Sequence, residues 1–303
     1  MSSPGQAKVP WNQPLSEYSG PVSASDLRRL EHPAAQAGAT HIARRNGCEE
    51  QAMTNSLENR VQEHFDQNIH EYSYRYIGAY LQICADRLTT LETLFTHEQP
   101  LNILDIGCGA GTFSDLILAR FPNASVYALD NSPGMLSKNS LSARKHLVQA
   151  DASRLPFVSK SFDVINIDTL MHHLVSHDGY KATLHRIESF LENAKSLIRP
   201  GGVIAVREIY HESFFATELH ARLIYEISSR KLPNILAAMV RAIGIRTANA
   251  GVCFLSRRQW MERFSALNPS HIVIKECPWR NCWHYRILGL RANGDYHCYL
   301  RFD

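Results

Sequence analysis

The hydrophobic and polar positions between residues 98 and 210 follow two alternating patterns. Short apolar runs, typical of buried strands, alternate with longer stretches in which apolar residues recur every three or four positions, as on one face of a helix. The pattern predicts strands at 101–106, 125–129, 146–148, 162–167 and 203–209, and helices at 112–120 and 180–197. Strands that alternate with helices imply a parallel sheet covered on both faces, so we expect an α/β fold.

The flanking segments do not share this alternation. Residues 1–50 are rich in Pro, Ser, Ala, Gln and Gly, and we expect a mobile N-terminal arm. Residues 51–97 predict an N-terminal helical cap segment, whose second helix runs from about Ser73 to Phe95. Residues 211–250 are helical in composition and interrupt the strand pattern, so we expect an inserted helical lid. We expect residues 251–303 to complete the domain that residues 98–210 begin.

Three capping and turn signals mark the ends of elements. Ser132 followed by Pro133 is typical of a helix cap and first turn. Ser256 with Gln259 three residues later predicts a second helix start, as in a capping box. Asn293-Gly294, between two apolar stretches, predicts the turn of a β-hairpin.

Composition narrows the functional classes. A net charge of +3 spread along 303 residues is too weak to favour nucleic-acid binding. No apolar run reaches the ~20 residues that a bilayer span needs, and the N-terminus has no signal-peptide pattern. Seven cysteines, an odd number, favour free thiols in a reducing compartment. We therefore expect a cytoplasmic protein with a small-molecule substrate and neither a nucleic-acid nor a membrane partner. If the protein forms an oligomer, a homodimer is the form that we consider.

The main motif is the loop Asp105-Ile106-Gly107-Cys108-Gly109-Ala110-Gly111-Thr112, which follows a predicted strand and opens a predicted helix. Its glycines let the backbone turn sharply and let a ligand approach closely. Amides at the start of a helix can then face polar ligand atoms. The dinucleotide fingerprint is G-x-G-x-x-G, whereas here the third glycine comes one residue earlier. This spacing disfavours a nicotinamide-dependent dehydrogenase.

With an acidic residue two positions before the first glycine, the loop resembles D/E-x-G-x-G-x-G, the first motif of class I S-adenosylmethionine-dependent methyltransferases. Further segments match that family in order along residues 60–210: Asp130, Asp151-Ala152, Phe162-Asp163-Val164-Ile165 and Leu197–Gly202. The resemblance implies a Rossmann-like, seven-stranded, mostly parallel sheet with helices on both faces. It also implies S-adenosyl-L-methionine as the cofactor of a small-molecule methyltransferase.

The resemblance further implies a place for each cofactor contact. The methionine part would lie along Gly107, Gly109 and Gly111, with its amino end near Asp105. The ribose would be held by Asp130, and the adenine by Asp151 and Ala152. Met135 either packs on the adenine or serves ordinary helix packing.

The acceptor is expected at the ends of the fourth and fifth strands, because ligands of open α/β sheets bind at the carboxyl ends of strands. A nucleophile that carries a proton needs a base, and the imidazole pKa of ~6.5 suits that role. His172 and Glu208 are the catalytic candidates. The alternative is that His172 only fixes its loop through hydrogen bonds.

Three histidines near the same strand ends suggest a finer hypothesis. His172, His173 and His211 could hold a divalent metal that stabilises an enolate during C-methylation of a 2-oxo acid. Arg75 and Arg207 would pair with the carboxylate of that acceptor. The alternatives are one histidine as base with the others structural, O- or N-methylation of another small metabolite, and a non-catalytic S-adenosylmethionine-binding protein.

Overall fold

A computed structural model describes residues 62–63, 66, 77–214, 217–230, 251–279 and 289–303. The predicted arm, most of residues 51–76 of the predicted cap segment, which include Arg75, and residues 231–250 of the expected lid lie outside the described residues. The division into arm, cap segment, methyltransferase domain and lid stays a prediction.

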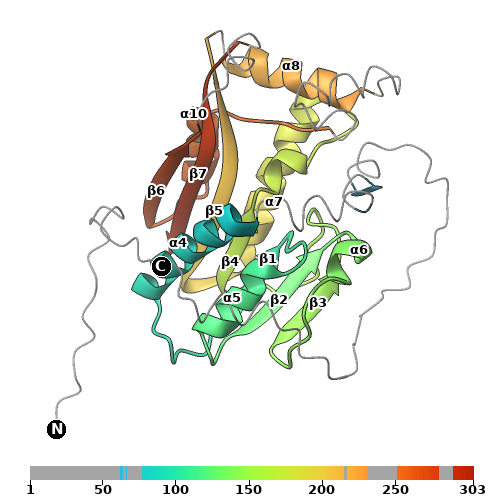
Figure 1. The fold of residues 1–303 in the computed structure, drawn as a ribbon. Coiled ribbons are helices and arrows are strands. Elements are labelled where there is room, and N and C mark those ends of the chain that lie inside the picture. The colour runs from blue at the N-terminus through green and yellow to red at the C-terminus, as the bar shows by residue number, and fades with distance from the viewer. Residues whose placement is uncertain (1–61, 64–65, 67–76, 215–216, 231–250, 280–288) are drawn as a thin grey trace.

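The described chain is built around one seven-stranded sheet in the order β3-β2-β1-β4-β5-β7-β6 (Figure 1). The strands β1 to β5 pair in parallel, and β7 is antiparallel to both β5 and β6. The predicted α/β class with a mostly parallel sheet is therefore confirmed. The strands are β1 (Asn102–Ile106), β2 (Ser125–Asp130), β3 (Lys145–Gln149), β4 (Phe162–Asp168), β5 (Ile198–Ser213), β6 (His271–Pro278) and β7 (Leu290–Phe302).

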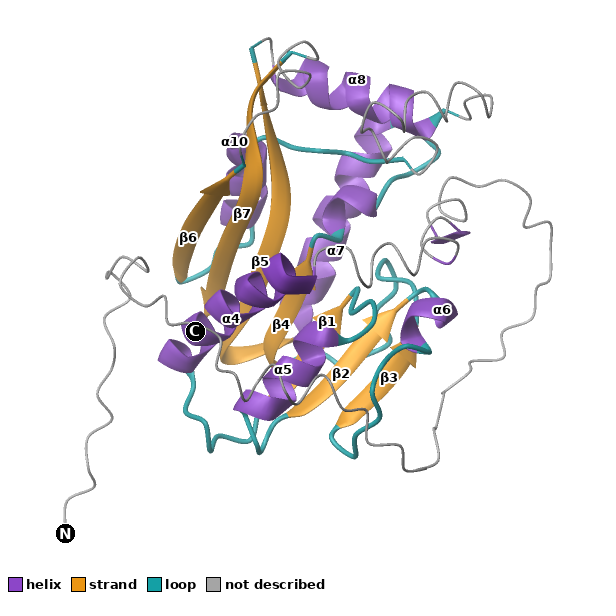
Figure 2. Ribbon diagram, in the orientation of Figure 1, coloured by secondary structure: helices purple, strands orange, loops and turns teal. Residues whose placement is uncertain are grey.

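Helices cover both faces of this sheet (Figure 2). On one face, apolar side chains of α4 and α5, such as Leu88 and Phe113, share a buried cluster with the strands. On the other face, Phe190 of α7 and Trp260 of α10 belong to a second buried cluster. The helical elements are α4 (Ile77–Leu94), α5 (Thr112–Arg120), α6 (Pro133–Leu136), the 3-10 turn η2 (Met171–His173), α7 (Tyr180–Leu197), α8 (Thr217–Ser229) and α10 (Arg257–Ala266).

Both predicted helix starts are confirmed. The Ser132 side chain accepts a hydrogen bond from the Met135 amide, with Pro133 in the first turn of α6. Ser256 and Gln259 form the reciprocal capping box at the start of α10. These local signals hold because the bonds that satisfy the first helical amides come from residues next to them in sequence.

The hairpin turn predicted at Asn293-Gly294 is wrong. Both residues lie inside the continuous strand β7, where they pair with His211 and Tyr210 of β5. A Cβ atom at Gly294 would lie 2.5 Å from the Cys277 carbonyl oxygen of β6. The glycine therefore allows a close approach between strands rather than a turn.

Strand β5 is longer than predicted. It continues through Ser213, so the first residues of the expected lid are strand, and they pair with the beginning of β7. Helix α8 follows at the far end of this extension (Figure 1). Within the described residues, no helix combines the length and apolar character needed to cross a membrane.

Candidate functional site

The glycine loop joins β1 to α5 and needs its glycines. Gly107, Gly109 and Gly111 have φ values of 72°, 54° and 81°, in the left-handed region that other residues rarely adopt. A Cβ atom at Gly111 would lie 1.8 Å from the Asn139 side-chain oxygen. The amides of Gly107 and Cys108 donate to the Leu129 carbonyl at 2.8 and 3.0 Å, which ties the loop to the end of β2.

Asp130 lies at the end of β2 and connects the glycine loop with the start of α6. Its two carboxylate oxygens accept hydrogen bonds from the amides of Gly109 (2.8 Å) and Ser132 (2.9 Å). Burial raises the pKa of Asp130, while these amides lower it. Because the amides favour the charged form, they supply the local support that an acceptor for ribose hydroxyls needs.

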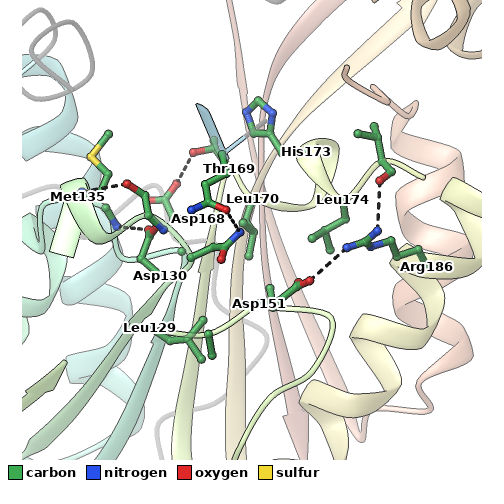
Figure 3. A pocket seen from close by; sticks show the side chains of 18 residues that line it. Leu129, Asp130, Met135, Asp151, Asp168, Thr169, Leu170, His173, Leu174 and Arg186 are labelled. Carbon is green, nitrogen blue, oxygen red and sulfur yellow. Dashed lines mark hydrogen bonds and ion pairs between the residues drawn. The ribbon is translucent and has the colours of Figure 1, made fainter. Parts of the chain in front are cut away.

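A cavity of about 240 Å³ opens at the carboxyl ends of the first four strands. Figure 3 shows Asp130 and Met135 on one side of it and Asp151, Leu174 and Arg186 on the other. The predicted cofactor residues in its lining are Gly107, Gly109, Asp130, Asp151 and Ala152, together with Met135. This position matches the place where open α/β sheets bind ligands.

Two predicted cofactor residues, Asp105 and Gly111, are not part of that lining. The Asp105 carboxylate is buried and accepts hydrogen bonds from Ser114 (2.6 Å) and the Asn166 amide group (2.6 Å). Burial raises its pKa and these bonds lower it. Asp105 therefore fastens β1 to α5 and β4, while Gly111 supplies the turn into the helix.

Asp151 sits at the rim of the cavity, after β3. Its carboxylate accepts from the Ser153 amide at 2.8 Å and lies 3.5 Å from Arg186 (Figure 3). The side chain is about half exposed. It is therefore accessible to a ligand in the cavity, with Ala152 beside it in the lining.

The end of β4 carries a buried ionic cluster centred on Asp168. Its carboxylate lies 2.9 Å from Arg87 of α4 and 2.7 Å from Arg207 of β5, and it accepts from the Tyr80 hydroxyl at 3.2 Å. Burial alone would raise the pKa of Asp168, but Arg207 and Arg87 lower it below its ordinary value. Asp168 is a fixed negative charge in the cavity wall.

Arg207 is already engaged by two carboxylates, because its second contact is Asp295 of β7 at 3.0 Å. Its expected role as a partner for a substrate carboxylate is therefore not supported by the described contacts. The sequence pattern alone did not indicate Arg87, Tyr80 or Asp168 as members of the site. The available signal was a charged residue, Arg87, directly beside the apolar face of α4.

His172 and Glu208, the predicted catalytic residues, are brought together. His172 Nδ1 lies 2.5 Å from Glu208 Oε1, and Glu208 Oε2 accepts the Met171 amide at 2.7 Å. Both side chains are buried, and neither lines the cavity, whereas His173 does. Glu208 thus fixes both the 3-10 turn and the orientation of the His172 ring.

The predicted metal set is not assembled. The His172 ring packs on His173, with ring centroids 4.0 Å apart, and it also stacks on Phe254 at 5.0 Å. The Phe254 ring in turn contacts His211 at 4.3 Å, so a hydrocarbon ring lies next to both imidazoles. In the part of the chain that the structure describes, no three His, Cys, Asp or Glu side chains are grouped to hold a metal.

The surroundings of His211 keep its imidazole in the neutral form. Burial, with smaller contributions from His220 and His172, lowers the pKa of His211 to about 3. Burial likewise lowers the pKa of His220 on α8. Both imidazoles are therefore neutral near pH 7.

Comparison with known proteins shows similarity to methyltransferases. The methyltransferase domain family matches residues 103–202. The trans-aconitate 2-methyltransferase of Acidovorax sp. (strain JS42) is 37% identical over 118 residues, 37% of this chain and 40% of the relative. A malonyl-[acyl-carrier protein] O-methyltransferase of Paenibacillus sp. (strain JDR-2) is 29% identical over 168 residues, 53% and 52% of the two chains. The chain spans about half or less of the length of these curated relatives.

Solved structures show the same fold at low identity. Phosphoethanolamine N-methyltransferase 2 of Haemonchus contortus, solved with S-adenosylhomocysteine, superposes with a TM-score of 0.57 at 13% identity, covering 82% of this chain and 61% of that chain. The complex of the Haloferax volcanii Trm112 activator with a methyltransferase gives a TM-score of 0.50 at 12% identity, covering 83% and 100%. These likenesses establish the architecture.

Proposed function

We propose, on the premise that this chain carries a class I S-adenosylmethionine-dependent methyltransferase domain, that it transfers the methyl group of S-adenosylmethionine to a small-molecule acceptor. The observation that carries the proposal is the cavity at the ends of β1 and β2. It combines the exposed backbone of Gly107 and Gly109 with the carboxylate of Asp130.

In this proposal each part of the cofactor meets a different wall of the cavity. The methionine part lies along Gly107 and Gly109, where no side chain blocks its approach. Asp130 accepts the ribose hydroxyls, and Asp151 with Ala152 contacts the adenine. Gly111 and Asp105 act from behind the loop, which they hold in shape.

The acceptor side is proposed to use the pair of His172 and Glu208. Glu208 accepts a hydrogen bond from Nδ1–H of His172, so Nε2 is the ring nitrogen that can take a proton. The acceptor atom attacks the methyl carbon, the bond from that carbon to sulfur breaks, and neutral S-adenosylhomocysteine leaves. The acceptor proton passes to His172 Nε2, and the Glu208 carboxylate stabilises the imidazolium.

The lid prediction also belongs to this proposal. The inner face of α8 packs toward the turn after β4, because the Tyr225 hydroxyl donates to the Ser176 carbonyl at 2.6 Å. His220 and Ala221 on the same face are buried. Helix α8 is thus attached to the loop that carries His172, which supports a role in closing the acceptor side.

The chemical class of the acceptor has two candidates. C-methylation of a 2-oxo acid remains the first, with His172 rather than a metal removing the proton, since the described histidines form no metal group. The names of the relatives, which mention trans-aconitate and malonyl-[acyl-carrier protein], favour O-methylation of a carboxylate. A carboxylate acceptor needs no base, so its methylation rate would stay constant over the pH range in which a histidine titrates. Where a base must remove a proton, the methylation rate would instead rise with pH.

The test is methyl transfer from isotope-labelled S-adenosylmethionine to a small-molecule extract, followed by mass spectrometry. We expect one metabolite to gain a labelled methyl group, with an equal amount of S-adenosylhomocysteine formed. Asp130→Ala is the control, and it should lose the product at limiting cofactor. If S-adenosylhomocysteine binds but no metabolite is labelled in any extract, the chain is a cofactor-binding protein and the enzymatic proposal is wrong.

A further inference from the structure

Helix α8 has one face that the described residues cover and an apolar face that they leave exposed. On the inner face, His220, Ala221, Tyr225 and Ser228 are buried. On the outer face, Leu219, Leu223 and Ile227 are 64%, 55% and 51% exposed. These three residues are four positions apart, so they form one stripe along the helix.

This stripe is unusual for the molecule. Eight large apolar side chains are exposed in the described residues, and four of them lie here: Phe214, Leu219, Leu223 and Ile227. Phe214, 57% exposed, directly follows β5 and comes before α8, which begins at Thr217. Figure 1 shows α8 at the edge of the molecule, away from β1, β2 and β3. A contiguous apolar surface at such an edge is typical of an interaction site.

A row of charged residues flanks the stripe, and the order of its charges indicates which partner the stripe fits. Its members alternate in sign at intervals of four residues: Glu218, Arg222, Glu226 and Arg230. Glu218, Arg222 and Arg230 are exposed, and Glu226 is half-buried. Among the described residues, the ion pairs of this row are intrahelical: Arg222 to Glu226 at 4.0 Å and Arg230 to Glu226 at 3.5 Å. Such exposed pairs contribute little and can rearrange.

We propose that α8 pairs with α8 of a second copy of this chain, antiparallel and about a two-fold axis near Leu223. In this arrangement Glu218 faces the partner's Arg230, and Arg222 faces the partner's Glu226. The apolar stripes meet each other beside these facing rows. A parallel two-fold pairing would place the two rows on opposite sides of the interface, so only the antiparallel pairing brings the opposite charges together.

The same charge order disfavours an anionic membrane surface. Helices that bind such surfaces carry Lys and Arg along the polar face, which attract the lipid headgroups. Here the row holds two acidic and two basic residues, so its net charge is zero. A second copy satisfies both the apolar stripe and the alternating charges.

Sedimentation velocity of the full-length chain tests the proposal. We expect a concentration-dependent dimer for the wild type, and a monomer for Leu223→Arg across the same concentrations. Val158→Arg is the matched control, because Val158 is 78% exposed outside α8, and it should remain dimeric. Circular dichroism and S-adenosylhomocysteine binding check that Leu223→Arg is folded. A wild type that stays monomeric, or that instead binds phosphatidylserine vesicles as a monomer, overturns the proposal.

A charge exchange tests the orientation. Arg222→Glu and Glu226→Arg should each weaken dimerisation by about tenfold, because each introduces two like-charge contacts by symmetry. An equimolar mixture of the two single variants should form heterodimers, since opposite charges then face each other again. If the mixture dimerises no better than either variant alone, the antiparallel pairing is wrong.

Discussion

The two ends of the site are built in different ways. On the proposed cofactor side, between β1, β2 and β3, the contacts come from backbone amides of the glycine loop and from the Asp130 carboxylate at the end of β2. On the proposed acceptor side, His172, Glu208 and Phe254 come from three distant parts of the chain, and His172 contacts both of the others. The first side surrounds an open cavity, and the second is a packed cluster.

This difference explains what each side can do. A loop defined by its backbone presents amides at fixed positions. Its contacts to a bound cofactor therefore do not depend on neighbouring side chains. A cluster of distant side chains can change with one substitution, so acceptor choice can differ between chains with the same loop. The ionic cluster at Asp168 lies between the two sides and joins α4, β4, β5 and β7.

The largest effect is expected where the two sides meet. Asp168→Asn removes the buried charge that pairs with Arg87 and Arg207, so two guanidinium groups remain without their central carboxylate. We expect the free energy of unfolding to fall by about 3–5 kcal/mol. Urea denaturation measures this change. Asp163→Asn, which removes a half-exposed pair with Arg199, should change it far less. Equal losses in both variants would contradict the account.

The next prediction distinguishes methyl transfer from cofactor binding. His172→Gln should lower the methyl-transfer rate by about 100-fold, because general-base catalysis is lost. The dissociation constant of S-adenosylhomocysteine should stay within about twofold, since His172 does not line the cavity. Glu208→Gln should reduce the rate less and alter its pH profile. Full activity of His172→Gln would assign that residue a purely structural role.

A smaller effect should appear in the pH dependence of stability. Burial, together with Arg87 and Arg207, lowers the pKa of His297 to about 3. An unfolded histidine takes up its proton near pH ~6.5, so between these values the unfolded state binds more protons. Stability is therefore full above pH ~6.5 and decreases as the pH falls toward 3, by at most about 1.4 kcal/mol per pH unit for this residue.

Thermal unfolding measured between pH 7.5 and 5 shows this slope. His297→Gln should reduce it, because the variant has no group to protonate in that window. An identical slope in the variant would mean that other groups, such as His211 with its similarly lowered pKa, account for the whole dependence.

The sequence predicts the glycine loop and the helix starts well because their signals are local. The glycine spacing, the strand before it and the caps at Ser132 and Ser256 each depend on a few neighbouring residues. The role of Asp105 could not be predicted, because its partner Asn166 lies 61 residues away in β4. The hairpin signal at Asn293-Gly294 failed for the same reason, since the close approach of β6 at Gly294 is a tertiary contact.

The proposed acceptor side could be predicted only in outline. Strand ends rich in histidine led to the candidates His172 and Glu208, which the fold places in contact. Their catalytic role stays a prediction. Their spacing could not reveal that Phe254 packs beside the His172 ring, nor that Arg207 is held by Asp168 and Asp295. These contacts decide which of several polar groups remains accessible, and they depend on burial and packing across the whole sheet.

Isothermal titration calorimetry with S-adenosylhomocysteine tests the central claim most directly. We expect the wild-type chain to bind it and not to bind NAD. Asp130→Ala should weaken binding by about 1–3 kcal/mol, because the ribose hydroxyls lose their acceptor. Asp178→Ala, which changes an exposed carboxylate outside the cavity lining, is the control and should bind as the wild type does. Unchanged affinity in Asp130→Ala, or binding of NAD in place of S-adenosylhomocysteine, would contradict the assignment of this cavity.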